Sequence, residues 1–379
     1  MVWIMEKHLD NTKLFKSLFM RLSLFTFCVA FASAQLIYGA NNDTIYSKYN
    51  SKFLVEPNKQ EGFHFFLGGH LYGDAGHQTS IYPSPSLIAN IDTINSSGAS
   101  FFISLGDNVR ESNKVQWSNF KNSFTNKLEM PFFSVMGNHD TLANAELAVK
   151  LYGPTFYTFR HQNNAFVFVD TIVNDGRVSG EQLDWFKTTL KECKLDGVDN
   201  VFFIGHMIIW QDDLEDSDFK LQYNYEGLFN FKEDILPELL VLRSKEIGVF
   251  VFSDDIGGGD DNPNFMFHHE DKENGIKYMS TGIGNNKNDA LIHAFVDEQN
   301  TLRFEGFSLT GKLLPEIERF DIAYWKKNMP YRGLSNKFQK RLYNNNFRLG
   351  AIFAFALAFS LLILWRIIIV IKRVRYGKR

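Results

Sequence analysis

The chain has little cysteine, with two residues in 379. Cys28 lies in an N-terminal segment with the pattern of a secretory signal, so Cys193 is left alone in the rest of the chain and an intrachain disulfide is excluded. Cys193 ends an amphipathic helix pattern, and the sequence supplies no basic neighbour of the kind that a catalytic thiol needs. We therefore interpret Cys193 as a packed residue rather than a nucleophile.

An excess of positive charge is also lacking. The 40 basic and 43 acidic residues give a net charge of -3, and no basic stripe outside the C-terminus would follow a phosphate backbone. This argues against nucleic acid as a partner. The content of 45% hydrophobic and 22% charged residues is typical of a globular protein. The 38 phenylalanines are scattered through apolar runs, which indicates core packing rather than a base-stacking platform.

The N-terminus has the pattern of a secretory signal. Three basic residues from Lys13 to Arg21 precede the apolar run "LSLFTFCVAFASA", which closes on small residues. We expect residues 1–34 to be a signal peptide cleaved after Ala34, and the alternative is an uncleaved N-terminal anchor. Under both alternatives the following region is exported, because positive charge precedes the apolar run.

The C-terminus predicts a transmembrane helix over residues 348–371. At a rise of about 1.5 Å per residue, the apolar run 349–371 is roughly 34 Å long, enough for a hydrocarbon core of about 30 Å. Arg366 is the only charge in this run and lies near one end, where its side chain can reach the headgroups. The basic residues in 372–379 are expected to stay cytoplasmic. The sequence therefore predicts a single-pass membrane protein with an extracytoplasmic domain.

Residues 41–320 alternate strand-like apolar runs with helical segments. The runs are "FHFFLG", "ASFFISLG", "PFFSVMG", "NAFVFVD", "NVFFIGH" and "IGVFVFSDD". A helix is expected at "SGEQLDWFKTTLKEC", where Ser179 and Gln182 have the spacing of a capping box, and "ALIHAFVDEQNTLRFEGFSL" predicts a hairpin. Continuous apolar strands between helices predict an α/β domain whose sheets are covered on both faces. A polar linker over residues 321–347 would join this domain to the membrane helix.

Polar residues follow five of these runs where each strand would end. They are His70, Asp107, Asn138, His139, Asp140, His206 and Asp255. These residue types bind divalent metals or move protons, and ligand sites in open α/β sheets lie beyond the carboxyl ends of the strands. We therefore expect them to converge on one crevice. A single "GH" or "GD" after a strand is more often a turn, so the signal lies in their combination.

The motifs "LGDN", "VMGNHD" and "FIGH", in this order, resemble the calcineurin-like metallophosphoesterases over roughly residues 62 to 310. The resemblance implies a two-sheet β-sandwich flanked by helices, with two divalent ions (Mn, Fe, Mg or Zn) at the strand ends. It implies that Asp107 bridges the ions and that Asn138 and His206 bind the second ion. By the same resemblance His139 would protonate the leaving group, with Asp140 orienting it.

Two motifs of the family are altered in this chain. The family's first motif is Asp-x-His, and here His70 matches the histidine while Gly68 stands at the aspartate. Its last motif is Gly-His-x-His, and here Asp255 and Gly257 stand at the two histidines. Both losses affect the first ion, so we expect one intact metal site. Asp255 would contribute an oxygen ligand to it.

The first ion would need substitute ligands. Asp74 and His77 would have to reach back across the turn at Gly73, and Asp260 and Asp261 would approach from the other side. The alternative is that Asp74 caps a turn and His77 faces solvent, as such residues commonly do in glycine-rich loops. The expected metal content is therefore one ion or two.

The expected function is a membrane-tethered, extracytoplasmic, metal-dependent phosphoesterase. Arg110 is a candidate phosphate clamp because a guanidinium fork matches phosphate oxygens, and the alternative is an exposed arginine on the following helix. A different function is an inactive binding or scaffold protein with the same fold at the membrane. Retention of His139 and Asp140 favours the enzyme, whereas Gly68 and Gly257 favour the scaffold.

Overall fold

The computed structural model describes residues 44–57, 61–141, 143–211, 214, 221, 229–254, 256, 266–328, 359–363 and 365–369. The chain divides into one compact unit, Met1–Trp325, and a second unit, Lys326–Arg379. The predicted segments 1–34 and 372–379, and most of the segments 321–347 and 348–371, lie outside the described residues. No helix within the described residues is both long and apolar enough to cross a membrane.

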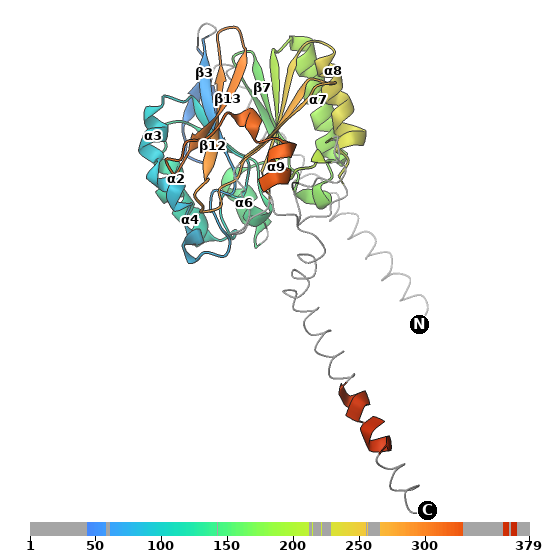
Figure 1. Ribbon diagram of the computed structural model, residues 1–379. Coiled ribbons are helices and arrows are strands. Elements are labelled where there is room, and N and C mark those ends of the chain that lie inside the picture. The colour runs from blue at the N-terminus through green and yellow to red at the C-terminus, as the bar shows by residue number, and fades with distance from the viewer. Residues whose placement is uncertain are drawn as a thin grey trace, which may run out of the picture. The chain divides into compact units, whose positions relative to one another are not determined.

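Two β-sheets form the centre of the first unit (Figure 1). Among the described residues, the five-stranded sheet has the order β13 (Leu302–Ser308), β12 (Ala290–Val296), β3 (Phe63–Gly68), β4 (Phe101–Ser104) and β5 (Phe132–Ser134). The six-stranded sheet has the order β10 (Phe267–Asp271), β11 (Ile276–Ser280), β9 (Gly248–Ser253), β8 (Asn200–Ile204), β7 (Asn164–Phe168) and β6 (Tyr157–His161). A separate hairpin pairs β1 (Thr44–Tyr46) with β2 (Phe53–Val55). All six predicted strands and the predicted closing hairpin, β12–β13, are confirmed.

Phenylalanine fills the space between the two sheets. Phe65 of the five-stranded sheet meets Phe166 and Phe202 of the six-stranded sheet edge-on, with ring centroids 5.4 and 5.5 Å apart. All three side chains are completely buried, and edge-to-face contacts of this kind add to the free energy of burial. The interpretation of the abundant phenylalanines as core residues is confirmed for these strands.

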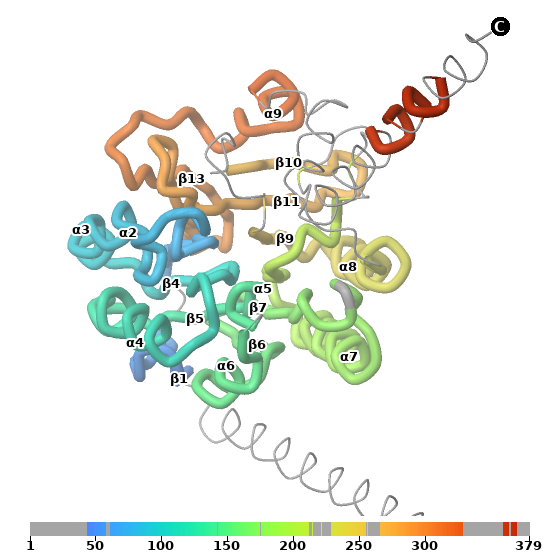
Figure 2. The backbone as a smooth tube through the Cα atoms, turned by 90° about the horizontal axis from the view of Figure 1, so that it is seen from below, coloured from blue at the N-terminus to red at the C-terminus, as the bar shows by residue number. Residues whose placement is uncertain are grey.

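Helices cover the outer faces of both sheets (Figure 2). The five-stranded sheet packs against α2 (Pro85–Ala89), α3 (Ile91–Ser96), α4 (Lys114–Ser123) and α6 (Ala145–Tyr152) through a second apolar cluster. On the six-stranded sheet, α7 (Gly180–Asp196) packs Phe186 edge-on against Phe203, and α8 (Leu236–Arg243) lies next to α7 and β9. The shorter helix α5 (Asn138–Thr141) follows β5, and α9 (Ile322–Asn328) follows β13. The predicted α/β fold, a two-sheet sandwich flanked by helices, is therefore confirmed.

Helix α7 begins where the sequence predicts it, but its capping differs. Ser179 is the N-cap residue and makes no side-chain capping hydrogen bond. Gln182 instead accepts a hydrogen bond from the backbone N–H of Asp170 at 2.7 Å and donates one to the carbonyl of Asp170 at 2.9 Å. The capping-box expectation is wrong, because the Gln182 side chain attaches the helix to the segment after β7.

The carboxyl ends of the parallel strands meet at one edge of the sandwich. Strands β3, β4 and β5 are parallel neighbours in one sheet, as are β7, β8 and β9 in the other. Loops that leave these strand ends therefore approach one another although they are far apart in sequence. This edge is the place where the predicted site residues are expected.

Candidate metal and catalytic site

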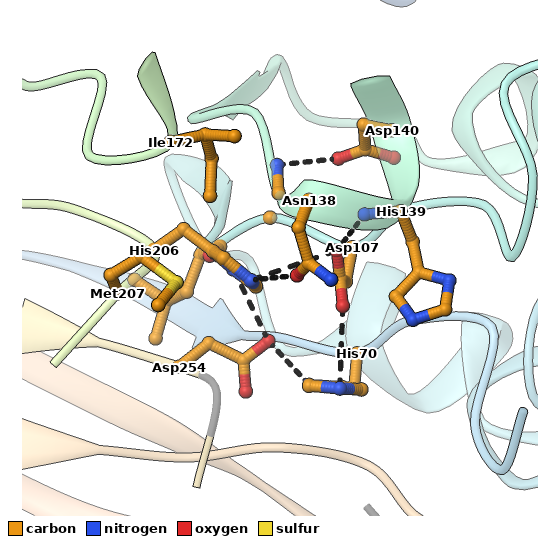
Figure 3. A network of polar contacts seen from close by, with 12 residues as sticks. His70, Asp107, Asn138, His139, Asp140, Ile172, His206, Met207 and Asp254 are labelled. Carbon is orange, nitrogen blue, oxygen red and sulfur yellow. Dashed lines mark hydrogen bonds and ion pairs between the residues drawn. The ribbon is translucent and has the colours of Figure 1, made fainter. Parts of the chain in front are cut away.

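Residues from four strand ends meet at this edge (Figure 3). His70 follows β3, Asp107 follows β4, Asn138 begins α5 after β5, and His206 follows β8. Two of them have backbone conformations that are unusual for residues other than glycine, with φ of +48° at His70 and +56° at Asp107. Left-handed residues of this kind are costly and cluster at functional sites. The structure thus brings together four of the five predicted metal ligands.

Asp107 lies at the centre of the group and is completely buried. Its Oδ1 accepts the backbone N–H of His139 at 2.9 Å and lies 3.6 Å from Nε2 of His206. Its Oδ2 lies 3.3 Å from Nε2 of His70 and has no hydrogen-bond partner among the described residues. A buried carboxylate oxygen without a hydrogen bond is costly, and a bound cation would compensate it.

His206 presents a second acceptor to the same space. Its Nδ1 lies 2.9 Å from the carbonyl oxygen of Leu105, which can only accept, so Nδ1 carries the hydrogen. In the neutral ring Nε2 then presents a lone pair, and it lies 3.0 Å from Oδ1 of Asn138. Two acceptors at this distance repel unless a proton or a cation lies between them. Together with Asp107 they form an O, O, N donor set that suits a divalent metal.

The donor set therefore fits one divalent ion held by Asp107, Asn138 and His206. Three protein ligands leave open coordination positions, which is the property of a catalytic rather than a structural metal site. No group of three or more His, Cys, Asp and Glu side chains in the described part of the chain is arranged to hold a metal ion. The amide of Asn138 is thus an essential member of the proposed set. His70 and Asp107 remain the matching ligands for a first ion.

Glycines allow the close packing of these side chains. A Cβ atom at Gly137 would lie 2.1 Å from Oδ1 of Asp107, and one at Gly106 would lie 2.6 Å from Nδ1 of His206. Gly106 also has a φ of +98°, a conformation that other residues rarely adopt. Both glycines are therefore needed for Asp107 and His206 to approach each other.

His139 lies next to Asp107, and a hydrogen bond at Nδ1 holds its ring. Its Nδ1 lies 2.7 Å from the carbonyl oxygen of Arg110, so this nitrogen donates and Nε2 is the atom that takes up or releases a proton. The ring of Tyr72, which is 2% exposed, lies 5.0 Å from the His139 ring and 5.5 Å from the His70 ring. Sequence reasoning missed Tyr72, because an aromatic residue in a glycine-rich loop carries no specific signal.

A family model described as calcineurin-like phosphoesterase matches residues 77–250. This segment, less than half of the chain, is similar to the calcineurin-like phosphoesterases. The match includes the motifs "LGDN", "GNHD" and "IGH", whereas His70 and Asp254 lie outside it. The resemblance inferred from the sequence is thus confirmed. The divergent first and last motifs are the parts that the family model does not reach.

Comparison with solved structures supports the fold. A purple acid phosphatase isolated from seeds of yellow lupin (Lupinus luteus) aligns with a TM-score of 0.50 and 11% sequence identity. The alignment covers 70% of this chain and 56% of the lupin chain, so this chain spans a little more than half the length of that protein. Identity at this level shows the fold alone. A search of curated proteins finds no match.

Asp140 has a different partner from the one expected. Its carboxylate accepts the backbone N–H groups of Asn108, Val109 and Gly137 at 2.9, 3.1 and 2.9 Å. Burial and the nearby Asp107 carboxylate raise the pKa of Asp140 to about 7, and the backbone donors act against this rise. Asp140 therefore holds the loop after β4, and the Arg110 carbonyl, not Asp140, orients the His139 ring.

The Arg110 guanidinium is bound to a neighbouring loop. Its Nη1 lies 3.5 Å from the carbonyl oxygen of Ala75 and 3.4 Å from that of His77, and its Nη2 lies 3.6 Å from Glu111. The side chain is 26% exposed. The loop carbonyls engage one of its three nitrogens, so the role of Arg110 as a phosphate clamp stays a prediction.

The predicted substitutes for the first-ion ligands do not reach the site in the described residues. Oδ1 of Asp74 accepts the backbone N–H of Gly76 at 2.8 Å, and the exposed His77 ring contacts the Thr79 hydroxyl at 2.8 Å. The turn-capping alternative is therefore the one observed. Asp255, Gly257, Asp260 and Asp261 lie outside the described residues.

The residue next to Asp255 does lie at the site. Asp254 is completely buried, and its Oδ2 lies 2.8 Å from Nδ1 of His70 and 3.8 Å from Nδ1 of His206. Alignment to the family's last motif places Asp254 at the glycine of that motif, so sequence reasoning passed over it. The repeated "DD" after a strand was the available signal, and it did not distinguish the two carboxylates.

Proposed function

We propose that the chain is a metal-dependent phosphoesterase that hydrolyses a phosphate ester with one divalent ion. One observation carries the proposal: the buried Asp107 carboxylate, whose Oδ2 has no hydrogen bond among the described residues, and the Asn138 amide oxygen meet Nε2 of His206. Oδ1 of Asp107 also accepts the backbone N–H of His139. Asp107, Asn138 and His206 would hold the ion. When bound, it would polarise a phosphoryl oxygen and lower the pKa of a water molecule.

His139 would act as the general acid. Because the Arg110 carbonyl holds Nδ1–H, the proton delivered to the leaving oxygen comes from Nε2 of the imidazolium. The Asp107 carboxylate accepts the His139 backbone N–H at 2.9 Å and so fixes the acid relative to the ligand set. Asp140 contributes indirectly, since it holds Gly137 and the loop after β4, and both of these elements position Asp107.

The location of the enzyme is a proposal from the sequence. The N-terminal signal pattern in residues 1–34, the apolar run 349–371 and the basic tail 372–379 support an extracytoplasmic domain tethered by one C-terminal helix. A substrate at or near the outer membrane surface would then be accessible. In intact cells, an epitope at the C-terminus should resist added protease while an epitope inserted at Gly311, in the exposed turn after β13, is cleaved. Cleavage of the C-terminal epitope as well contradicts this topology.

A scaffold without catalysis is the second candidate. The observation in its favour is the contact of His70 with carboxylates on both sides, 2.8 Å from Asp254 and 3.3 Å from Asp107, in a site without the family's first aspartate. Such a closed network stabilises the edge of the sandwich without metal. The scaffold predicts that His139→Ala leaves every function of the protein intact.

The test is hydrolysis of generic phosphate monoesters and diesters by the full chain in detergent with added Mn²⁺. We compare the wild type with Asp107→Asn, which keeps the shape of the side chain and removes its charge. The matched control is Asp289→Asn, a buried aspartate that binds the backbone N–H groups of Gly284 and Asn286. Activity lost in Asp107→Asn and kept in the control supports the phosphoesterase. Absence of metal-dependent hydrolysis in the wild type sinks it.

A further inference from the structure

Asp254 lies on the Nδ1 side of the two histidines, below the His206 ring and beside the His70 ring in Figure 3. Its Oδ2 is nearest to the Nδ1 atoms of His70 and His206, at 2.8 and 3.8 Å. The Nε2 atoms of the same rings face Asp107, at 3.3 and 3.6 Å. Asp254 therefore contacts the histidines where they do not bind metal, and Asp107 contacts them where they would.

The Asp254 carboxylate fits a space that two glycines leave open. A Cβ atom at Gly69 would lie 2.2 Å from Cγ of Asp254, and one at Gly282 would lie 2.6 Å from its Oδ1. The backbone N–H of Asp254 also donates to the carbonyl of His206 at 2.9 Å. Asp254 is thus bound by its side chain to the loop after β3 and by its backbone to the loop after β8. It links the two sheets at the site.

The first motif does not supply this carboxylate. A Cβ atom at Gly68 would lie 2.5 Å from Cδ2 of Leu291 and 3.5 Å from Leu71 and Phe102. Position 68 therefore faces the apolar cluster under the helices and not the ligand set. The carboxylate beside His70 comes from the end of β9 in the other sheet.

We propose that Asp254 is a positioning residue that accepts the Nδ1–H of His70 and holds its ring with Nε2 toward Asp107. Carboxylates that bind the outer N–H of a metal-ligating histidine fix its tautomer and its orientation. Asp254 then compensates for part of what the first motif lacks, by orienting a ligand rather than by being one. The consequence for metal affinity rests on the proposed function and on Nε2 of His70, 3.3 Å from Oδ2 of Asp107, taking an open coordination position of the same ion. The position of the His70 proton rests on neither.

The first test reads the proton directly. Long-range ¹H–¹⁵N NMR spectra of the metal-free full chain, labelled at its 10 histidines, report which ring nitrogens carry hydrogen. His70→Gln assigns the His70 signals. We expect a protonated Nδ1 at His70 in the wild type and a changed Nδ1 signal in Asp254→Ala. An unprotonated Nδ1 in the wild type, or spectra that do not change in Asp254→Ala, would overturn the proposal.

The second test measures Mn²⁺ affinity by calorimetry. Loss of such an outer partner typically lowers metal affinity about 10–100-fold, so Asp254→Ala should do the same. Asp254→Asn should lose less, because its amide oxygen still accepts the Nδ1–H. Asp289→Asn controls for removal of a buried carboxylate elsewhere and should bind as the wild type does. Equal affinity in the wild type and Asp254→Ala would refute the positioning role.

A glycine variant displaces Asp254 without removing a polar group. In Gly69→Ala the new methyl group overlaps the Asp254 carboxylate, so His70 should lose its partner and affinity should fall as in Asp254→Ala. Gly76→Ala, whose Cβ would meet Asp74 at an ordinary 3.4 Å, is the matched control and should bind normally. If the chain hydrolyses no ester but these affinities change as expected, Asp254 keeps its role and only the proposed function fails. Unchanged affinity in Gly69→Ala contradicts the role of Asp254.

Discussion

Oδ1 of Asn138 lies 3.0 Å from Nε2 of His206, although the two residues come from different sheets. Nδ1 of the His206 ring donates its hydrogen to the Leu105 carbonyl. In the neutral ring Nε2 therefore carries no hydrogen, and its contact with Asn138 joins two acceptors. A proton on Nε2 or a cation within reach of both atoms removes the repulsion between them, and a divalent ion would accept a lone pair from each. The contact therefore supports the proposed metal site.

Asn138 should be required for metal binding. Asn138→Ala removes one oxygen ligand, and we expect Mn²⁺ affinity to fall by more than about 100-fold, the upper range for an outer partner. Asn138→Asp keeps an oxygen at the same place and adds charge, so it should bind at least as tightly as the wild type. Calorimetric titration measures both. Equal affinities for the alanine variant and the wild type would remove Asn138 from the ligand set.

The role of His139 as general acid predicts a dependence on the leaving group. His139→Ala should slow hydrolysis of phenyl phosphate about 10²-fold or more, because phenolate leaves poorly without a proton. It should slow hydrolysis of p-nitrophenyl phosphate much less, since nitrophenolate is a stable anion. Steady-state rates on the two esters give the comparison. A uniform loss on both substrates contradicts proton donation by His139.

Restoring the family's first aspartate should not restore a second ion. In Gly68→Asp the new side chain meets Leu291 and faces apolar neighbours, and overpacking of this kind costs about 1–3 kcal/mol before the burial of a charge is added. Urea unfolding should show a lower stability than in the wild type. Gly68→Ala has the same Cβ overlap without the carboxylate and should be less destabilised. Metal analysis that finds an additional ion in Gly68→Asp would contradict the finding that position 68 faces the apolar cluster and not the ligand set.

A histidine pair outside the site should make stability depend on pH. His293 lies 2.8 Å from His64 and near Arg303, and burial, followed by these two groups, lowers its pKa to about 4. Burial also lowers the pKa of His64. The unfolded chain, with an ordinary histidine pKa of about 6.5, therefore binds protons that the folded chain does not. Stability should fall as pH falls from about 6.5 toward 4.

His293→Phe tests this effect. The ring would lie among Phe66 and Phe295, whose centroids are 4.2 and 4.1 Å from that of His293. Glu305, the cross-strand partner of His293, and its ion pair with Arg303 remain in both proteins. Urea unfolding at pH 7 and pH 5 should show a smaller loss of stability in the variant than in the wild type. An identical loss in both would exclude His293 as the cause.

The elements of the fold could be predicted because each strand is an apolar run that ends in a glycine or a polar residue. "FHFFLG" and β3, Phe63–Gly68, coincide, and the ends of such strands located His70, Asp107, Asn138 and His206. Parallel neighbours bring these ends together whatever the length of the intervening chain. The location of these residues at the ends of strands was therefore enough to predict that they form one site.

The partners of individual site residues could not be predicted from the sequence, because they depend on the direction in which each side chain points. Asp140 was assigned to His139 by resemblance, but backbone N–H groups bind its carboxylate. Sequence reasoning also passed over Asp254 and did not show that position 68 faces the apolar cluster, since alignment to a motif does not show which way a side chain points from an irregular strand end. Only the packed structure shows that Gly69 leaves room for Asp254.

The most direct measurement is the activity of the metal-free full chain as Mn²⁺ is added in known amounts. A site held by Asp107, Asn138 and His206 predicts that hydrolysis of a phosphate ester rises linearly and saturates at one ion per chain. Asp107→Asn should show no such rise. A wild type that stays inactive at every Mn²⁺ concentration, or that becomes active only when a second ion binds, would contradict the one-ion phosphoesterase.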